Sequence, residues 1–147
     1  REKSRFVKEF EENPKWSLRF HTANNNEGGL FSLGDVYIYP TTKEGVGLTI
    51  TEALCTGMPV VTTDYPTMNE WFDDGYAGRY IKTKRVKKGS MPTHKAYASI
   101  NDLAKIMEDY IKHPETIREQ SHNARKLVEE SYNWDDRDEL MIRLLRG

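Results

Sequence analysis

Two glutamates, Glu44 and Glu52, stand with seven residues between them beside a glycine-rich segment. A carboxylate can accept paired hydrogen bonds from vicinal hydroxyls, such as those of a ribose or a hexose. Gly45 and Gly47 have no side chain, so the backbone there can come close to a ligand. Taken singly, each acid has a plainer interpretation: Glu44 as an exposed loop acid, and Glu52 as a favourable charge in the first turn of a helix.

This segment lies between a predicted strand and a predicted helix. Residues 35–40 form a short, nearly continuous apolar run closed by Pro40, which is typical of a parallel strand covered on both faces. Residues 48–56 are predicted to be a helix, with Gly57 as its C-terminal cap. Ligands bind beyond the carboxyl ends of parallel strands, and a helix N-terminus suits a phosphate. The sequence thus indicates an anion or phosphate site at residues 41–47, with an ordinary tight turn as the alternative.

Strands and helices alternate along the rest of the chain. The apolar spacing predicts helices at 2–12, 67–72, 99–112, 115–131 and 135–146, and strands at 16–21, 59–63 and 79–81. This alternation favours an α/β fold with a Rossmann-like parallel sheet flanked by helices. The chain is predicted to be a single domain, residues 1–147, with residues 132–147 as a C-terminal tail helix.

Composition narrows the classes of function. The net charge of −1 gives no overall attraction to nucleic acid or membrane, and no apolar run approaches the roughly 20 residues of a membrane span. The single cysteine, Cys55, cannot form an intrachain disulfide. It fits a reducing compartment and is predicted to be a small core residue. The chain does not begin with Met, so we expect it to be a piece of a longer protein.

The residues between positions 40 and 78 resemble, in type and order, the signature of glycosyltransferase family 4 (glycosyl transferases group 1). The two glutamates have the spacing of that family, and the segment around Tyr132 resembles its closing segment. The residues that carry the resemblance are Pro40, Glu44, Gly45, Val46, Gly47, Leu48, Glu52, Ala53, Gly57, Pro59, Val60, Val61, Asp64, Glu70 and Gly78. The resemblance implies the C-terminal, nucleotide-sugar-binding half of a retaining glycosyltransferase with the GT-B fold.

The resemblance also implies a role for the matched residues. Glu44 would be the catalytic residue and hold hydroxyls of the transferred sugar, while Glu52 would bind the ribose hydroxyls of the donor. Backbone amides near Gly47 would contact the diphosphate or the sugar, and Thr22 and Ala23 would lie beside the base. The implied donor-binding set is Glu44, Gly45, Val46, Gly47, Leu48, Thr49 and Glu52.

Substrates and partners follow from the same resemblance. The donor would be a nucleoside diphosphate sugar of UDP or GDP type. It would bind without a metal or other cofactor, because positive side chains and helix dipoles stabilise the diphosphate. The acceptor would be a glycan, a lipid or a small molecule, and an N-terminal acceptor domain would lie outside this chain. We expect no nucleic-acid partner, and a cytoplasmic location with at most peripheral membrane contact.

The chain departs from the family pattern at the diphosphate. The family usually neutralises it with an Arg and a Lys upstream of Glu44, and neither Arg19 nor Lys43 matches those positions. The sheet would also lack the family's first strand or strands. Two alternatives stay open: a non-catalytic nucleotide-sugar-binding or partner module, and a nucleotide-sugar epimerase of the same fold. The spacing of the two glutamates argues against the epimerase.

The segment 82–95 is longer than the family has at this place. It is rich in Lys and Arg and contains no acid. We interpret it as a solvated, mobile loop, with a contact for an anionic acceptor or a lipid headgroup as the alternative.

Overall fold

The computed structural model describes residues 30–89, 94–133 and 135–146. The chain divides into two compact units, Arg1–Leu30 and Phe31–Gly147, and the strands and α-helices described below belong to the second. The predicted helix at 2–12 and the predicted strand at 16–21 lie outside the described residues. The single-domain assignment of residues 1–147 stays a prediction.

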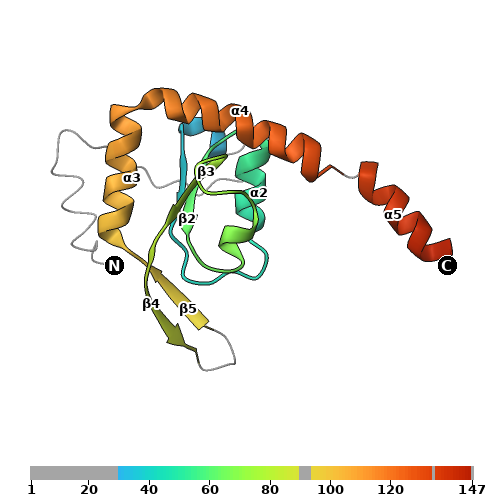
Figure 1. The fold of residues 1–147 in the computed structure, drawn as a ribbon, viewed down its shortest axis with the longest axis horizontal. Coiled ribbons are helices and arrows are strands. Elements are labelled where there is room, and N and C mark those ends of the chain that lie inside the picture. Colours follow the sequence, from blue (N-terminus) through green and yellow to red (C-terminus); the bar gives the residue numbers. More distant parts are fainter. Residues whose placement is uncertain (1–29, 90–93, 134, 147) are drawn as a thin grey trace. The chain divides into compact units, whose positions relative to one another are not determined.

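A parallel sheet of three strands forms the centre of the second unit (Figure 1). Its strand order is β1 (Tyr37–Tyr39), β2 (Val60–Thr63) and β3 (Gly78–Ile81). Val60 of the middle strand lies opposite Tyr37 on one side and Gly78 on the other. All four residues of β2 are buried, which explains why this strand is an unbroken β-branched run.

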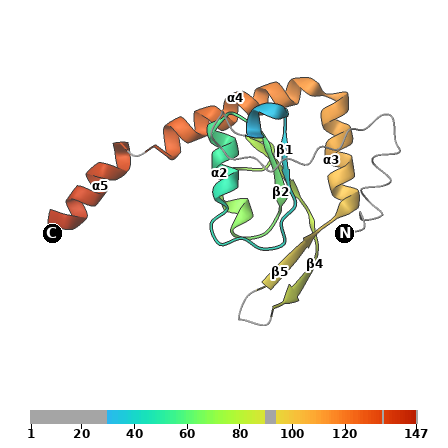
Figure 2. The ribbon, with the colours of Figure 1, turned by 180° about the vertical axis from the view of Figure 1, so that it is seen from behind.

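Helices cover both faces of the sheet. The described helices are α2 (Leu48–Cys55), α3 (Ile100–Lys112), α4 (Pro114–Ser131) and α5 (Asp135–Arg146), with 3-10 helices η1 (Leu30–Leu33) and η2 (Met68–Glu70). α2 packs Ile50 and Leu54 in one core cluster with Val60, whereas α3 packs Ile106 in a second cluster with Val61. Figures 1 and 2 show α2 and α3 on opposite sides of the strands. The predicted α/β fold with a parallel sheet flanked by helices is confirmed.

α4 connects the two core clusters. Its Ala124 is buried in the first cluster, and its Ile117 packs against the second. Between these positions the buried Gln120 accepts a hydrogen bond from the Tyr110 hydroxyl at 2.6 Å and donates one to the Gly75 carbonyl at 2.9 Å. Burial raises the pKa of Tyr110 to about 12. The phenol therefore stays a neutral donor at physiological pH, and the buried amide stays paired.

Most of the described residues of the segment 82–95 lie in the two antiparallel strands of a hairpin, so the prediction of a mobile loop is wrong. The strands are β4 (Thr83–Lys88) and β5 (His94–Ala98). The pattern failed because Lys and Arg occupy both faces of this ribbon, so the period-two apolar alternation of a half-buried strand is missing. At the base of the hairpin the Ala96 N–H donates to the Thr42 carbonyl at 2.8 Å.

Two smaller expectations also need correction. The predicted helix at 67–72 is only the 3-10 helix η2. Cys55, predicted to lie in the core, is exposed, because α2 buries the face that carries Ile50, Ala53 and Leu54.

The predicted tail helix is observed as α5. It exposes five apolar side chains, namely Leu140, Met141, Ile142, Leu144 and Leu145. None of the helices in the described part of the chain is long and apolar enough to span a bilayer.

The close approach of β2 and β3 requires a glycine at position 78. A Cβ on Gly78 would lie 2.0 Å from the carbonyl oxygen of Val60, so the two strands would have to separate. We expect Gly78→Ala to lower the free energy of unfolding by roughly 3 kcal/mol, measured by urea unfolding. Gly34→Ala is the matched control, because its Cβ would meet nothing within 4 Å, and it should change stability by less than about 0.5 kcal/mol. Equal stability of the two variants would contradict this strand packing.

Candidate functional site

Residues 40–47, called the glycine loop below, join the carboxyl end of β1 to the N-terminus of α2. Two threonines of β2 hold its start. The Thr62 hydroxyl donates to the Tyr39 carbonyl at 2.9 Å, and the Thr63 hydroxyl donates to the Thr41 carbonyl at 2.7 Å. Both threonines are fully buried, and a buried hydroxyl without an acceptor would cost about 1–3 kcal/mol. The loop therefore starts at a fixed place on the sheet edge where parallel-sheet proteins bind ligands.

Glu44 lies within the glycine loop and is half-buried. Its Oε1 accepts hydrogen bonds from the hydroxyls of Tyr39 and Thr41, the second at 3.2 Å. Its backbone carbonyl accepts a third bond from the Thr67 hydroxyl at 3.3 Å. The interpretation of Glu44 as an exposed loop acid is therefore wrong. Both side-chain bonds use Oε1, so Oε2 has no hydrogen-bond donor among the described residues and can accept one from a ligand hydroxyl.

Tyr39 orients this carboxylate. Its hydrogen bond to Glu44 raises the pKa of the Tyr39 phenol above the usual 10.0; burial adds to the shift, and the Thr49 hydroxyl opposes it. Because the folded-state pKa is raised, the phenol is a neutral donor at physiological pH, and the bond is lost only as the pH rises through the raised value. The sequence carried no signal for this contact, since Tyr39 reads simply as a strand residue.

Gly47 ends the glycine loop in the left-handed region, with φ 82° and ψ 42°. A Cβ at this buried position would lie 3.2 Å from Cδ1 of Ile50 and 3.3 Å from Nε1 of Trp71. That Nε1 donates to the Val46 carbonyl at 3.0 Å. The fold alone thus requires glycine at position 47. Gly45, by contrast, is exposed, and a Cβ there would meet nothing within 4 Å, so it leaves open backbone surface for a ligand.

The N-terminus of α2 offers its amides to a ligand. The helix begins at Leu48 with no side-chain cap and no acid in its first turn. The first N–H groups of a helix have no intrahelical partner, and the helix dipole adds about half a positive charge there. Val46 and Leu48 are exposed at this end. The Thr49 hydroxyl is buried without a hydrogen bond of ordinary geometry, which is uncommon for such a group.

Glu52 is the fifth residue of α2 and is exposed. It lies beyond the first turn, so the interpretation as a first-turn dipole charge is wrong. Within the described residues its carboxylate makes no ion pair and no hydrogen bond. A free carboxylate therefore follows the glycine loop about one turn along the same helix.

The predicted site residues fall into two groups. Residues 44–49 and Glu52 occupy the glycine loop and α2, whereas Thr22 and Ala23 lie outside the described residues. Trp71, which is outside the predicted site set, also holds the loop through its indole N–H. In the described part of the chain, no three His, Cys, Asp or Glu side chains are placed to hold a metal ion. The metal-free donor site stays a prediction.

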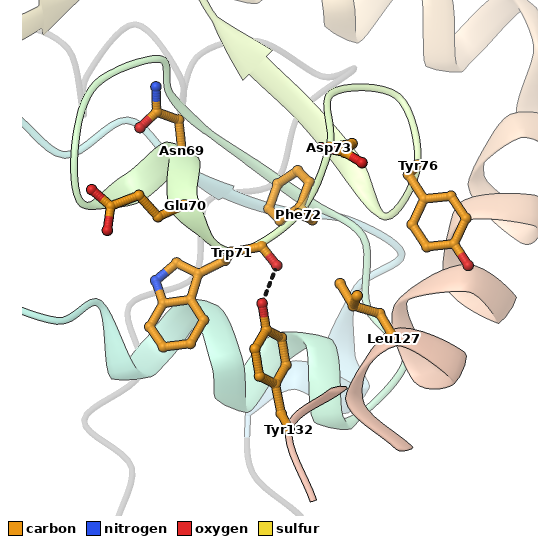
Figure 3. Close-up of a pocket in the computed structure, with 8 residues that line it drawn as sticks. All are labelled: Asn69, Glu70, Trp71, Phe72, Asp73, Tyr76, Leu127 and Tyr132. Atoms are coloured by element: carbon orange, nitrogen blue, oxygen red, sulfur yellow. Dashed lines mark hydrogen bonds between the residues drawn. The ribbon is translucent and has the colours of Figure 1, made fainter. Parts of the chain in front are cut away.

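Trp71 is itself held from α4 (Figure 3). The Tyr132 hydroxyl donates to the Trp71 carbonyl at 2.6 Å, and the two rings meet edge to face at 5.4 Å between centroids. A cavity of about 340 Å³ adjoins this contact, and its lining includes Tyr76 and Leu127. The end of α4 thus supports the glycine loop indirectly, through Trp71.

Known proteins resemble the chain in sequence. The family model described as "Glycosyl transferases group 1" matches residues 11–127. A sucrose synthase of Denitrovibrio acetiphilus is 35% identical over 99 residues, which is 67% of this chain and 11% of that protein. A sucrose synthase of Acidithiobacillus caldus is 30% identical over 111 residues, which is 76% of this chain and 13% of that protein. The chain thus spans little more than a tenth of the length of either relative.

A solved structure resembles the fold. It is the C-terminal domain of a glycosyl transferase group 1 family protein (LpcC) from Francisella tularensis, with a TM-score of 0.60 and 20% sequence identity. The likeness covers 79% of this chain and 52% of that one. It shows that the described strands and helices have the fold of a GT-B C-terminal domain.

The structural requirement for Gly47 can be tested separately from ligand binding. A left-handed conformation costs a non-glycine residue about 1–2 kcal/mol, and crowding against Ile50 and Trp71 adds to this. We expect Gly47→Ala to lower the free energy of unfolding by roughly 2–3 kcal/mol, measured by thermal or urea unfolding. Gly45→Ala, in the same loop, should change it by less than about 0.5 kcal/mol. Equal losses in the two variants would show that the Trp71 contact does not constrain the loop.

Proposed function

The chain belongs to the group 1 glycosyltransferases, and on that premise we propose that it is the donor-binding domain of an enzyme that transfers a sugar from a nucleoside diphosphate sugar to an acceptor hydroxyl. Because the chain spans only part of each relative, the activity of the whole protein is part of the proposal. The finer assignment that we propose is family 4, with retention of the anomeric configuration. The spacing of Glu44 and Glu52 supports it.

The proposal rests chiefly on how the Glu44 carboxylate is hydrogen-bonded. Tyr39 and Thr41 occupy Oε1, so the carboxylate is oriented while Oε2 remains available. It stands beside the open backbone of Gly45 and just before the N-terminus of α2. A carboxylate held in this way can accept a hydrogen bond from a hydroxyl of the transferred sugar without first having to be ordered.

The diphosphate is proposed to lie against the backbone amides of Gly47, Leu48 and Thr49. The uncapped start of α2 supplies these donors together with the positive end of the helix dipole. When the bond between sugar and diphosphate breaks, negative charge grows on the leaving diphosphate, and fixed donors stabilise that charge. Lys43, exposed in the same loop, can add a positive charge. No metal is part of the proposal.

The nucleotide is proposed to extend along α2 to Glu52. An unpaired carboxylate can accept hydrogen bonds from both hydroxyls of a ribose, and Glu52 has no competing partner in the described structure. Both UDP and GDP donors remain in the proposal.

The acceptor is proposed to be a glycan, a lipid or a small molecule, bound by a further N-terminal domain. Among these acceptors we favour a sugar hydroxyl, because two relatives are named sucrose synthase. We propose a cytoplasmic location and no nucleic-acid partner. Membership of a transferase family argues against a nucleotide-sugar epimerase, and a non-catalytic binding module is the rival that experiment must exclude.

Calorimetric titration of the chain with UDP, GDP and ADP tests the donor site. We expect selective binding of one nucleotide. Glu52→Gln should weaken that binding about 10- to 100-fold, because a hydrogen bond to a charged group contributes about 1.5–3 kcal/mol. Glu119→Gln is the matched control, since Glu119 is also an exposed helical glutamate without an ion pair in the described structure, and it should bind as the unchanged chain does.

Two results would count against this account. Equal affinity of Glu52→Gln and Glu119→Gln would remove Glu52 from the donor site. The absence of binding by any of the three nucleotides would favour a module that has lost the donor site, or one that needs residues outside this chain to complete it. Titration of a longer form of the protein would then separate these two cases.

A further inference from the structure

The hairpin β4–β5 carries a dense positive charge. Residues 82–98 contain six Lys and Arg residues and no Asp or Glu, although the whole chain has a net charge of −1. The remainder of the chain is therefore net negative. Attraction to an anionic partner must consequently arise locally, at this hairpin, and not from the overall charge.

These cations have no counter-charge in the described part of the fold. Lys84, Arg85, Lys87, Lys88 and Lys95 are all exposed, and none of them forms an ion pair with a carboxylate in the described structure. Like charges on facing strands repel each other and destabilise a hairpin. Here Lys87 lies directly opposite Lys95. Among the described residues no carboxylate offsets this repulsion, so the charge is available to an anionic partner.

The cations spread over the ribbon and do not converge on one point. Arg85 and Lys87 lie over the ring of Tyr97, at 4.8 and 6.0 Å from its centroid. Val86, between them in sequence, points to the other face of the strand and is 43% exposed. Positive charge spread around an exposed apolar side chain suits an extended anionic surface better than a single small anion.

A hollow of about 420 Å³ at the base of the hairpin does not change this conclusion. Its lining includes Lys82 and Lys84 and the start of α3. The Ser99 side chain already caps that helix by accepting a hydrogen bond from the Asp102 N–H. The Asp102 carboxylate accepts a hydrogen bond from the Lys82 N–H at 2.8 Å, so an acid lies next to a residue of this lining and would repel a small anion.

The single aromatic side chain of residues 82–98 is Tyr97. Binding of single-stranded nucleic acid uses aromatic faces on which bases stack, but Arg85 and Lys87 already lie over this ring. Basic side chains combined with exposed apolar surface are instead typical of contact with anionic lipid. The exposed Val86 completes that combination.

We propose that the hairpin β4–β5 binds the surface of a membrane that contains anionic phospholipids and holds the protein there peripherally. The base of the hairpin is fixed to the carboxyl edge of the sheet by the bond from the Ala96 N–H to Thr42 and by a bond from the Thr83 hydroxyl to the Asp64 carbonyl at 2.7 Å. Thr42 belongs to the glycine loop. The hairpin therefore presents that edge of the sheet to the membrane, whether or not the proposed donor site is correct.

Sedimentation of the full chain with lipid vesicles tests the proposal. The probes are vesicles of phosphatidylcholine alone and vesicles in which about a third of the lipid is phosphatidylglycerol. The chain should bind the second kind only, and high salt should release it, because salt screens charges at a surface. Each lysine near an anionic surface strengthens binding about fivefold. The triple variant Lys84→Gln, Lys88→Gln and Lys95→Gln should therefore bind roughly 100-fold more weakly.

The matched control is the triple variant Lys105→Gln, Lys112→Gln and Lys126→Gln, which removes the same charge from α3 and α4. It should bind anionic vesicles within about threefold of the unchanged chain. Thermal unfolding checks that both triple variants are folded. If the hairpin triple variant is unstable, the single variant Lys95→Gln replaces it, with an expected loss of about fivefold.

Three results would overturn the proposal. The first is equal binding by the hairpin variant and the control variant. The second is release from anionic vesicles by single-stranded RNA at the same phosphate concentration, which would identify nucleic acid as the partner. The third is release by millimolar glycerol phosphate, which would identify a site for a small anion. Binding of nucleotides to the chain is measured separately, so the membrane proposal can fail while the donor site stands.

Discussion

Burial of β2 on both faces is the constraint from which the candidate site follows. A strand in this position must satisfy every polar side chain internally, and its last two residues are Thr62 and Thr63, both fully buried. Their hydroxyls donate to the carbonyls of Tyr39 and Thr41. The hydrogen bonds that satisfy these buried hydroxyls therefore also fix the end of β1 and the start of the glycine loop. Packing and site geometry depend on the same side chains.

The fixed start of the glycine loop in turn determines the positions of Glu44 and of the N-terminus of α2. Tyr39, placed by the sheet, orients the Glu44 carboxylate, whose second oxygen has no donor among the described residues. At the other end of the glycine loop, Trp71 holds Val46 and fills the space beside Gly47. The loop is thus restrained at both ends and open in the middle. Such preorganisation is what electrostatic stabilisation of a leaving diphosphate requires, and this is the role that we propose for the loop.

The apolar periodicity of the sequence, together with its Gly and Pro residues, was enough to predict the sheet and its main helices. The apolar run at β2 and the cap at Gly57 are local signals, and each marks a boundary of an observed element. The contacts that define the site are not local. Trp71 and Val46 are 25 positions apart in the sequence, and no pattern in either segment indicates that they form a hydrogen bond. The hairpin lacks such a signal for a different reason: no residue of β4 is buried and its cations lie on both faces, so the strand shows no apolar alternation.

The central claim is that a donor diphosphate binds at the start of α2, beside Glu44. Backbone NMR of the ¹⁵N-labelled chain, titrated with a nucleoside diphosphate, addresses it directly by reporting each amide separately. We expect the largest shifts at the amides of Gly47, Leu48 and Thr49, because their N–H groups would donate to the phosphate oxygens. Shifts centred on the hairpin β4–β5, with the amides of the glycine loop unchanged, would contradict it.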